Sequence, residues 1–296
     1  MEKIHKKPLF GVIGGSGLYE IKALTNRRWV HVDSPFGAAS DDLLFGELHG
    51  EEIVFLPRHG RGHRIPPSRI NYRANIDVLK RVGVESIVSV SAVGSLKEDL
   101  HPGDFVLVDQ FIDRTFAREK SFFDVGLVAH VSMAQPVCSF LGNALAKAAE
   151  GLGMRFVRGG TYLTMEGPQF STRAESLLYR QWGCDVIGMT NMPEAKLARE
   201  AELCYATVAM VTDYDCWHES HEAVSVDQIV AVLRRNAEHA GALIVNLVEV
   251  LKSCADTCVA GCRSALDNAI ITPPEARDPE MVKKLDAVAG RVLRRG

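Results

Sequence analysis

The chain has 296 residues, of which 47% are hydrophobic and 24% charged, the composition of an ordinary globular protein. A disordered chain is excluded, because it would be poor in apolar residues and rich in net charge. The formal net charge of −3 excludes the positive field that nucleic acid or an anionic membrane requires. No apolar run approaches the ~20 residues of a membrane span, and residues 9–13 are too short for the core of a signal peptide. We therefore expect a cytoplasmic protein with no nucleic-acid or membrane partner.

Short apolar segments alternate with amphipathic ones along the chain, which is typical of an α/β protein. The predicted strands are 9–13, 29–33, 53–57, 86–91, 105–109, 160–164, 185–189 and 205–212. The predicted helices are 68–82, 136–152, 173–182, 193–202 and 225–251, with a last helix opening at Asp278-Pro279. Several strands are rich in β-branched residues, so we expect a sheet covered on both faces. This pattern predicts a single domain over 1–296, with a core at about 9–250 and a helical tail at about 252–296.

Three predicted strands end in groups that suit an anion. Residues 14–17 form a glycine-rich loop in which Ser16 adds a hydroxyl donor, although a plain tight turn is the alternative. Residues 57–64 are basic, and Arg58 can hold an oxyanion through two parallel hydrogen bonds, unless this is a solvated basic loop. Residues 89–95 carry hydroxyls and a glycine. Because ligands of α/β sheets collect at the carboxyl ends of strands, the three together favour an anion site.

Two carboxylates, Asp213 and Asp215, follow the predicted strand 205–212 and project to the same side if the strand continues. Like charges this close raise the pKa of one group, which suits a proton donor at neutral pH. Metal binding is the rival interpretation, but no third carboxylate or histidine has a convincing spacing. After the turn 165–169, Phe170 is a candidate to stack on a flat ring, and a place in the core is its alternative.

Three of the seven cysteines, Cys254, Cys258 and Cys262, recur every fourth residue, which would place them on one helical face. A metal site is one interpretation, but it is disfavoured because no fourth ligand stands at zinc-like spacing. Half-buried thiols or a disulfide remain open, and the cysteines do not identify a function.

Taken in chain order, the motifs of this sequence closely resemble those of the 5′-methylthioadenosine phosphorylases, a family in the trimeric purine nucleoside phosphorylase superfamily. The matching stretches are 14–17, 33–37, 58–61, 71–75, 109–115, 166–171, 173–176, 212–217 and 223–227. The resemblance covers about residues 9–250 and leaves the tail without a motif. It implies one α/β domain with a mixed, partly barrel-like β-sheet flanked by helices, and a homotrimer, with a hexamer left open.

The resemblance also implies a reaction, in which inorganic phosphate cleaves 5′-methylthioadenosine to adenine and 5-methylthioribose 1-phosphate. Phosphate is the co-substrate, and no cofactor or metal is implied. The implied phosphate site holds Ser16, Arg58, His59, Ser91, Ala92 and Thr190. The implied nucleoside site holds Met189, Phe170, Ser171, Tyr214, Val226 and, from a neighbouring subunit, His130. Asp213 and Asp215 are the implied catalytic and base-binding pair, with Asp213 as the acid that protonates the leaving purine.

The carboxylates also bear on the choice of base. Adenine offers an N6 amino donor, and an ionised carboxylate only accepts, so Asp213 and Asp215 favour a 6-amino purine. The 6-oxopurine relatives carry Glu and Asn where this chain has Ser171 and Asp213. Two alternatives stay open: a methylthioinosine or general purine nucleoside phosphorylase, and a non-catalytic nucleoside-binding protein that kept the fold. The failed dinucleotide fingerprint at residues 15–20 excludes a dehydrogenase.

Overall fold

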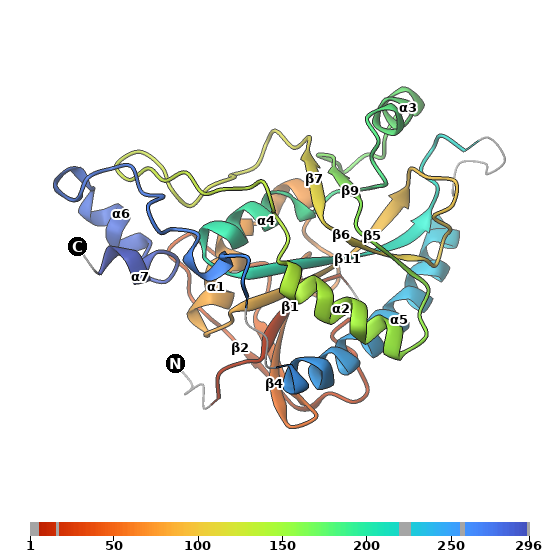
Figure 1. Cartoon of the computed structure of the whole chain (residues 1–296), viewed down its shortest axis with the longest axis horizontal. Coiled ribbons are helices and arrows are strands. Elements are labelled where there is room, and N and C mark those ends of the chain that lie inside the picture. The colour runs from red at the N-terminus through yellow and green to blue at the C-terminus, as the bar shows by residue number, and fades with distance from the viewer. Residues whose placement is uncertain (1–5, 16–17, 219–225, 255–257, 295–296) are drawn as a thin grey trace.

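A computed structural model of the chain describes residues 6–15, 18–218, 226–254 and 258–294. Its centre is a sheet of eleven described strands with helices packed on both faces (Figure 1). The strands are β1 (Phe10–Gly14), β2 (Thr25–Val30), β3 (Leu43–Leu48), β4 (Glu51–Pro57), β5 (Ser86–Ser95), β6 (Phe105–Val108), β7 (Gln110–Asp113), β8 (Phe156–Arg158), β9 (Thr161–Thr164), β10 (Val186–Gly188) and β11 (Cys204–Asp213). The sheet runs β2-β3-β4-β1-β5-β10-β9-β7, and it forks at β5, which also pairs with β11.

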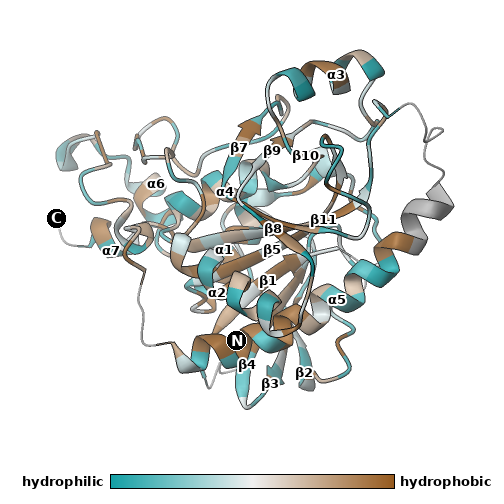
Figure 2. Cartoon of the chain, turned by 45° about the vertical axis from the view of Figure 1, so that its right-hand side comes forward, coloured by the Kyte–Doolittle hydropathy of each residue, from teal (hydrophilic) through white to brown (hydrophobic). Residues whose placement is uncertain are grey.

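The sheet is mixed, as expected. Strands β4, β1, β5 and β11 are parallel where they pair, whereas β10 runs antiparallel to β5. Its two faces bury different residues of the same strands: Val88 of β5 and Val208 of β11 lie in one apolar cluster, and Ile87 and Tyr205 lie in another. The prediction of a sheet covered on both faces is therefore confirmed. Figure 2 shows the hydrophobic residues concentrated on these central strands.

The helices and turns of 3-10 helix lie between and after the strands. They are η1 (Pro67–Arg69), α1 (Tyr72–Arg81), α2 (Ser139–Gly151), α3 (Arg173–Gln181), α4 (Asn191–Glu200), α5 (Val226–Ser253), η2 (Cys262–Ser264), η3 (Pro274–Ala276), α6 (Pro279–Lys284) and α7 (Gly290–Leu293). Residues of α1 and α4 pack into the cluster that contains Ile87 and Tyr205, and residues of α2 and α5 pack into the cluster that contains Val88 and Val208. Among the described helices, none has the length and apolar character that a membrane crossing needs.

Some predicted elements are wrong. The strand expected at 29–33 lies earlier, at β2, and sequence patterns gave no sign of β3, β7 or β8. Strand β2 is largely exposed at the sheet edge and β8 has three residues, so neither carries a clear apolar pattern.

The C-terminal segment also differs from its prediction. The helical tail is wrong, because only η2, η3, α6 and α7 are helical between residues 258 and 294, and each is short. Three of its side chains, Leu266, Leu285 and Val288, are buried in the same cluster as α1 and α4. The predicted helix start is confirmed, since the Asp278 side chain accepts hydrogen bonds from the first backbone N–H groups of α6. This segment is part of the core rather than an appendage.

Candidate active site

The parallel register of the central strands brings distant loops to one edge of the sheet. Pro57 at the end of β4 lies beside Gly14 at the end of β1, and Ile13 lies beside Ser89 of β5. Two residues further along β5, Ser91 reaches α4, where its hydroxyl donates to Asn191 Oδ1 at 3.0 Å. Three of the anion-friendly segments therefore converge with the start of α4, as the sequence predicted for strand ends. We refer to Arg58, His59, Ser91, Ala92 and Thr190 as the anion cluster.

Arg58 is almost fully buried, and most of its guanidinium is engaged within the protein. Its Nε donates to Glu194 Oε2 at 2.9 Å, Nη1 donates to Val90 O at 3.0 Å, and Nη2 donates to Ser89 Oγ at 2.6 Å. A guanidinium has five N–H donors, so Nη1 keeps one for a ligand. In this conformation Arg58 therefore cannot offer two parallel hydrogen bonds to an oxyanion.

Glu194 belongs to the candidate site, although the sequence did not single it out. It is buried in the first turn of α4 and accepts from Arg58, from the Ser89 hydroxyl at 2.6 Å and from Tyr205 Oη at 2.9 Å. This carboxylate compensates the buried charge of Arg58 and fixes α4 against β5 and β11. The only sequence signal was the Pro-Glu pair at a predicted helix start.

In the rest of the anion cluster, polar groups lie close to one another. Thr190 is the N-cap residue of α4, but its side chain makes no capping bond. The buried Tyr162 hydroxyl, which has no hydrogen-bond partner among the described residues, lies next to Ser91 and Thr190, and burial raises its pKa. Ala92 is exposed although it lies inside the central strand β5. An exposed residue at the centre of a covered sheet marks an opening at this point.

His59 has a defined tautomer. Its Nδ1 lies 2.8 Å from Ile65 O, which only accepts, so Nδ1 carries the proton. The ring stacks on His63 with centroids 4.3 Å apart. Burial lowers the pKa of His59 to about 4, and the nearby Arg58 charge adds to this. At neutral pH its Nε2 is therefore an acceptor, suited to a ligand oxygen that carries a proton.

The two carboxylates lie together at the end of β11, next to Gly94 of β5. Asp213 Oδ1 accepts the backbone N–H of Asp215 at 2.8 Å, and Thr212 Oγ1 lies 2.7 Å from Asp213 Oδ2. A side chain at position 94 would press against Asp213 Oδ1, at 3.1 Å from the new Cβ, so glycine leaves room for the pair.

Burial raises the pKa of both carboxyl groups. For Asp215 the neighbouring charge of Asp213 raises it further. Asp215 Oδ2 is buried and has no hydrogen-bond partner among the described residues. A buried acceptor without a partner is costly, and a ligand donor is one way to satisfy it.

Arg118 is a second residue that the sequence did not single out. It lies in an irregular segment, with its side chain 1% exposed. Its Nη1 donates to Met189 O and Met192 O, both at 2.7 Å, and its Nη2 donates to Glu166 O at 2.6 Å. Nε also forms an ion pair with the Glu166 side chain at 3.1 Å. Arg118 thus joins the turn after β9 to the segment after β10, where Met189 packs against Gly167.

The structure does not bring every predicted site residue together. Phe170 is 68% exposed, and the Tyr214 ring packs on Trp217 and bonds to His101 through its hydroxyl. His130 is exposed and lines a separate cavity of about 420 Å³ with Lys196 and Glu200. Ser171, by contrast, does lie at the carboxylate pair: it is half-buried, and its side chain is next to the Asp215 carboxyl. Ser16 and the side chain of Val226 lie outside the described residues.

Comparison with known proteins decides the family. Residues 9–249 match the model of the phosphorylase superfamily. The chain belongs to this superfamily. It is 62% identical over 293 residues to the S-methyl-5′-thioadenosine phosphorylase of Rhodospirillum rubrum, covering 99% of this chain and 100% of that protein. The same-named protein of Cereibacter sphaeroides is 60% identical over 288 residues, covering 97% and 99%.

Solved structures of superfamily members agree. A methylthioadenosine phosphorylase from an antarctic soil metagenomic library has a TM-score of 0.90 and 49% identity, covering 95% of this chain and 99% of that one. The Schistosoma mansoni methylthioadenosine phosphorylase in complex with adenine has a TM-score of 0.82 and 36% identity, covering 89% and 99%. The resemblance to the 5′-methylthioadenosine phosphorylases and the predicted fold class are confirmed.

Proposed function

We propose that this chain catalyses the phosphorolysis of 5′-methylthioadenosine to adenine and 5-methylthioribose 1-phosphate. The observation that carries the proposal is the pair Asp213 and Asp215 at the end of β11, with Asp215 Oδ2 left without a partner among the described residues. Ser91 and Ala92 of the anion cluster lie on β5, the strand that pairs with β11, and Thr190 precedes α4, which supports a phosphate site beside the pair. Relatives that carry this activity in their names support the same conclusion.

Asp213 acts as the general acid. The bond between C1′ and N9 breaks towards an oxocarbenium ion, so the purine leaves with negative charge and needs a proton at N7. Burial favours the neutral form of Asp213 by raising its pKa. The Thr212 hydroxyl has one proton and can donate it to Val93 O at 3.2 Å, which leaves its oxygen to accept from a protonated Asp213. The acid proton therefore has a partner before substrate binds.

The anion cluster holds the nucleophile. Arg58 contributes its remaining N–H and a fixed positive charge, and Ser91 and Thr190 contribute hydroxyls. His59 Nε2 accepts the proton of monohydrogen phosphate, because its Nδ1 is committed to Ile65 O. Bound phosphate places negative charge against the developing sugar cation, and holding both reactants removes an entropic barrier.

Asp215 selects the base. Its unpartnered oxygen accepts from the N6 amino group of adenine, which also satisfies a buried acceptor. A 6-oxopurine presents an acceptor at the same place and would face a carboxylate, which disfavours methylthioinosine and inosine.

Kinetics of two variants test these roles. Asp213→Asn should lower kcat on 5′-methylthioadenosine by roughly 10²- to 10⁴-fold, because the general acid is lost. Asp215→Asn should lower kcat/KM for it by roughly 10- to 100-fold, because one charged hydrogen bond to N6 is removed, and should cause no loss for methylthioinosine, whose O6 then no longer faces a carboxylate. The matched control is Asp99→Asn, which replaces an exposed aspartate and should leave kcat and kcat/KM for both substrates unchanged. Full turnover by Asp213→Asn, or an unchanged base preference in Asp215→Asn, would contradict the assignment.

We further propose that the chain works as a cytoplasmic homotrimer without a cofactor. What supports a shared site is the position of His130, which is exposed and lines a cavity apart from the carboxylate pair, so a neighbouring subunit would have to supply it. Light scattering should give the mass of three chains. Oligomers mixed from His130→Ala and Asp213→Asn chains should recover activity that neither variant has alone, whereas a monomer or an unshared site would give no recovery.

A further inference from the structure

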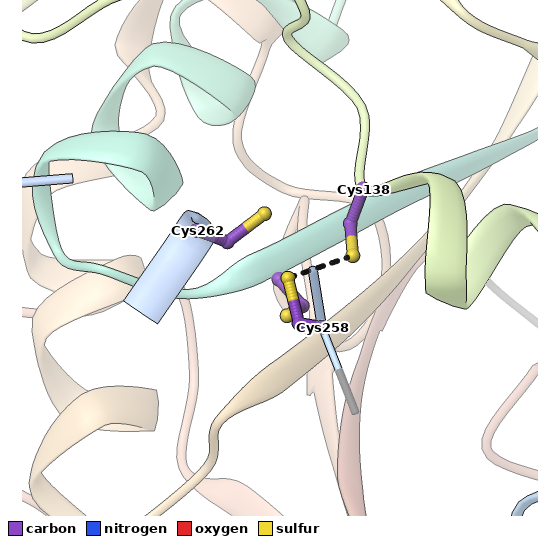
Figure 3. A group of neighbouring side chains, drawn as sticks. Cys138, Cys258 and Cys262 are labelled. Carbon is purple, nitrogen blue, oxygen red and sulfur yellow. Dashed lines mark hydrogen bonds between the residues drawn. The ribbon is translucent and has the colours of Figure 1, made fainter. Parts of the chain in front are cut away.

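Four cysteines that are far apart in sequence come together at the amino end of β11. Cys138 is the N-cap of α2, Cys204 is the first residue of β11, and Cys258 and Cys262 belong to the C-terminal segment. Their four Sγ atoms all lie within 4.8 Å of one another, and the sulfurs of Cys138 and Cys258 are 3.6 Å apart. Figure 3 shows the side chains of Cys138, Cys258 and Cys262 directed toward a common point. We refer to these four residues as the thiol cluster.

The thiol cluster has the dimensions of a tetrahedral metal site. A zinc ion lies about 2.3 Å from each thiolate, so the sulfurs of a four-cysteine site are about 3.8 Å apart. The separations here, 3.6 Å for one pair and no more than 4.8 Å for any, bracket that value. Small rotations of the side chains would seat an ion with no movement of the strands.

The surroundings of the thiol cluster are largely buried and include one cation. Cys138, Cys204 and Cys262 are fully buried, so the site excludes water, and Cys258 is partly buried. Arg199, itself buried, is a cation near Cys262. This cation offsets part of the negative charge that four thiolates and a divalent ion carry.

We propose that the thiol cluster binds one zinc ion as a structural site. Four protein ligands leave no open coordination position, which is typical of structural rather than catalytic zinc. The site lies at the start of the ten-residue strand β11 and the carboxylate pair at its end, about 30 Å apart at the rise of an extended strand. The ion joins the C-terminal segment to α2 and β11, and it takes no part in the cleavage of the nucleoside.

This inference corrects the sequence analysis. The three cysteines at 254, 258 and 262 do not share a helical face, because α5 ends at Ser253 and Gly261 adopts a left-handed backbone with φ of 67°. Cys254 is not a member of the cluster, and the missing ligands are Cys138 and Cys204. Because Cys138 and Cys204 are each more than fifty positions from the next cysteine of the cluster, the sequence shows no recognisable zinc spacing.

Metal titration of the reduced full-length protein tests the proposal without any variant. The protein is reduced, freed of metal with a chelator under anaerobic conditions, and titrated with Co²⁺ and then Zn²⁺. We expect one Co²⁺ per chain, with the intense visible absorption of a tetrahedral thiolate site, and its loss when Zn²⁺ displaces the cobalt. Elemental analysis should then find one zinc per chain, and the Tm should rise with zinc concentration because the ion binds the folded state.

Variants locate the metal. Cys262→Ser and Cys258→Ser should lose the cobalt spectrum and the zinc-dependent rise in Tm. Cys254→Ser, which changes a nearby cysteine outside the cluster, should keep both. Wild-type turnover should be the same for zinc-loaded and metal-free protein at a temperature where both are folded.

Three results would overturn the proposal. The first is the absence of a thiolate cobalt spectrum in fully reduced wild-type protein. The second is a spectrum that survives in both Cys258→Ser and Cys262→Ser, which would place the metal elsewhere. The third is the finding by mass spectrometry of two disulfides among the four cysteines together with no metal binding after their reduction, which would make the cluster a covalent clamp.

Discussion

At the scale of single residues, the candidate site contains carboxyl groups whose ionised form is disfavoured by their surroundings. Asp213 and Asp215 lie half-buried next to each other, and partial burial raises the pKa of each. Such a cost in folding free energy is expected where function requires a carboxyl group at a position that disfavours its charge.

Asp215→Asn should therefore make the ligand-free protein more stable at pH 7. The pKa of Asp215 is higher in the folded state than in the unfolded chain, where it is about 3.9. Over the range between these two pKa values the folded state binds more protons, so its stability falls as pH rises through that range. Urea unfolding at pH 7 should give a higher midpoint for Asp215→Asn than for wild type, and the gap should narrow towards pH 4. A lower midpoint at pH 7 would contradict this.

The anion cluster shows what sequence reasoning can and cannot provide for single residues. Arg58 and Ser91 lie in strand-end motifs and Thr190 followed from the family resemblance, and the structure brings their segments together. Glu194 was not found, because a carboxylate in the first turn of a helix is common and its partner Arg58 is 136 residues away.

At the scale of elements, the central strands were predictable because each is a short run of buried β-branched and apolar residues. Strands β1, β4, β5 and β11 were all placed within a few residues of their observed positions. The capping box of α3, formed by Thr172 and Glu175, matches the predicted start of that helix. The segment around Arg118 has neither helical nor strand structure, so no periodic pattern could show how it connects other elements.

Arg118→Lys keeps the positive charge, but it should still weaken nucleoside binding and lower the stability of the protein. Lysine cannot reproduce a planar fork that bonds Met189 O, Met192 O and Glu166 at once. We expect KM for the nucleoside to rise several-fold and the unfolding free energy to fall by about 2–4 kcal/mol, because buried carbonyls and a carboxylate lose donors.

Steady-state kinetics and urea unfolding measure both effects of Arg118→Lys. Arg263→Lys is the control, since its ion pair with Glu85 lies at the surface and should contribute little. Wild-type KM and stability in Arg118→Lys would contradict the role we give to Arg118.

At the scale of the whole molecule, the C-terminal segment returns to the core after leaving α5. It contributes buried apolar side chains, and Arg291 forms an ion pair with the buried Glu202 at 2.6 Å and with Asp267 at 2.5 Å. Such long-range contacts, like those of the thiol cluster, follow from the path of the chain and cannot be read from local spacing.

Arg291→Ala should destabilise the protein by about 2–4 kcal/mol, because it leaves the Glu202 carboxylate buried without its cation. Arg294→Ala, an exposed arginine at the end of the same helix α7, should change stability by less than about 0.5 kcal/mol. Thermal and urea unfolding of the two variants provide the comparison. Equal effects would show that the C-terminal segment contributes no specific ion pair.

The most direct test of the central claim is the release of adenine from 5′-methylthioadenosine with and without inorganic phosphate, beside methylthioinosine and inosine. We predict release from 5′-methylthioadenosine that depends on phosphate, with little cleavage of the two 6-oxopurines. Release without phosphate would mean a hydrolase and would contradict the role of the anion cluster. Cleavage of the 6-oxopurines alone would contradict the role of Asp213 and Asp215 in selecting the base.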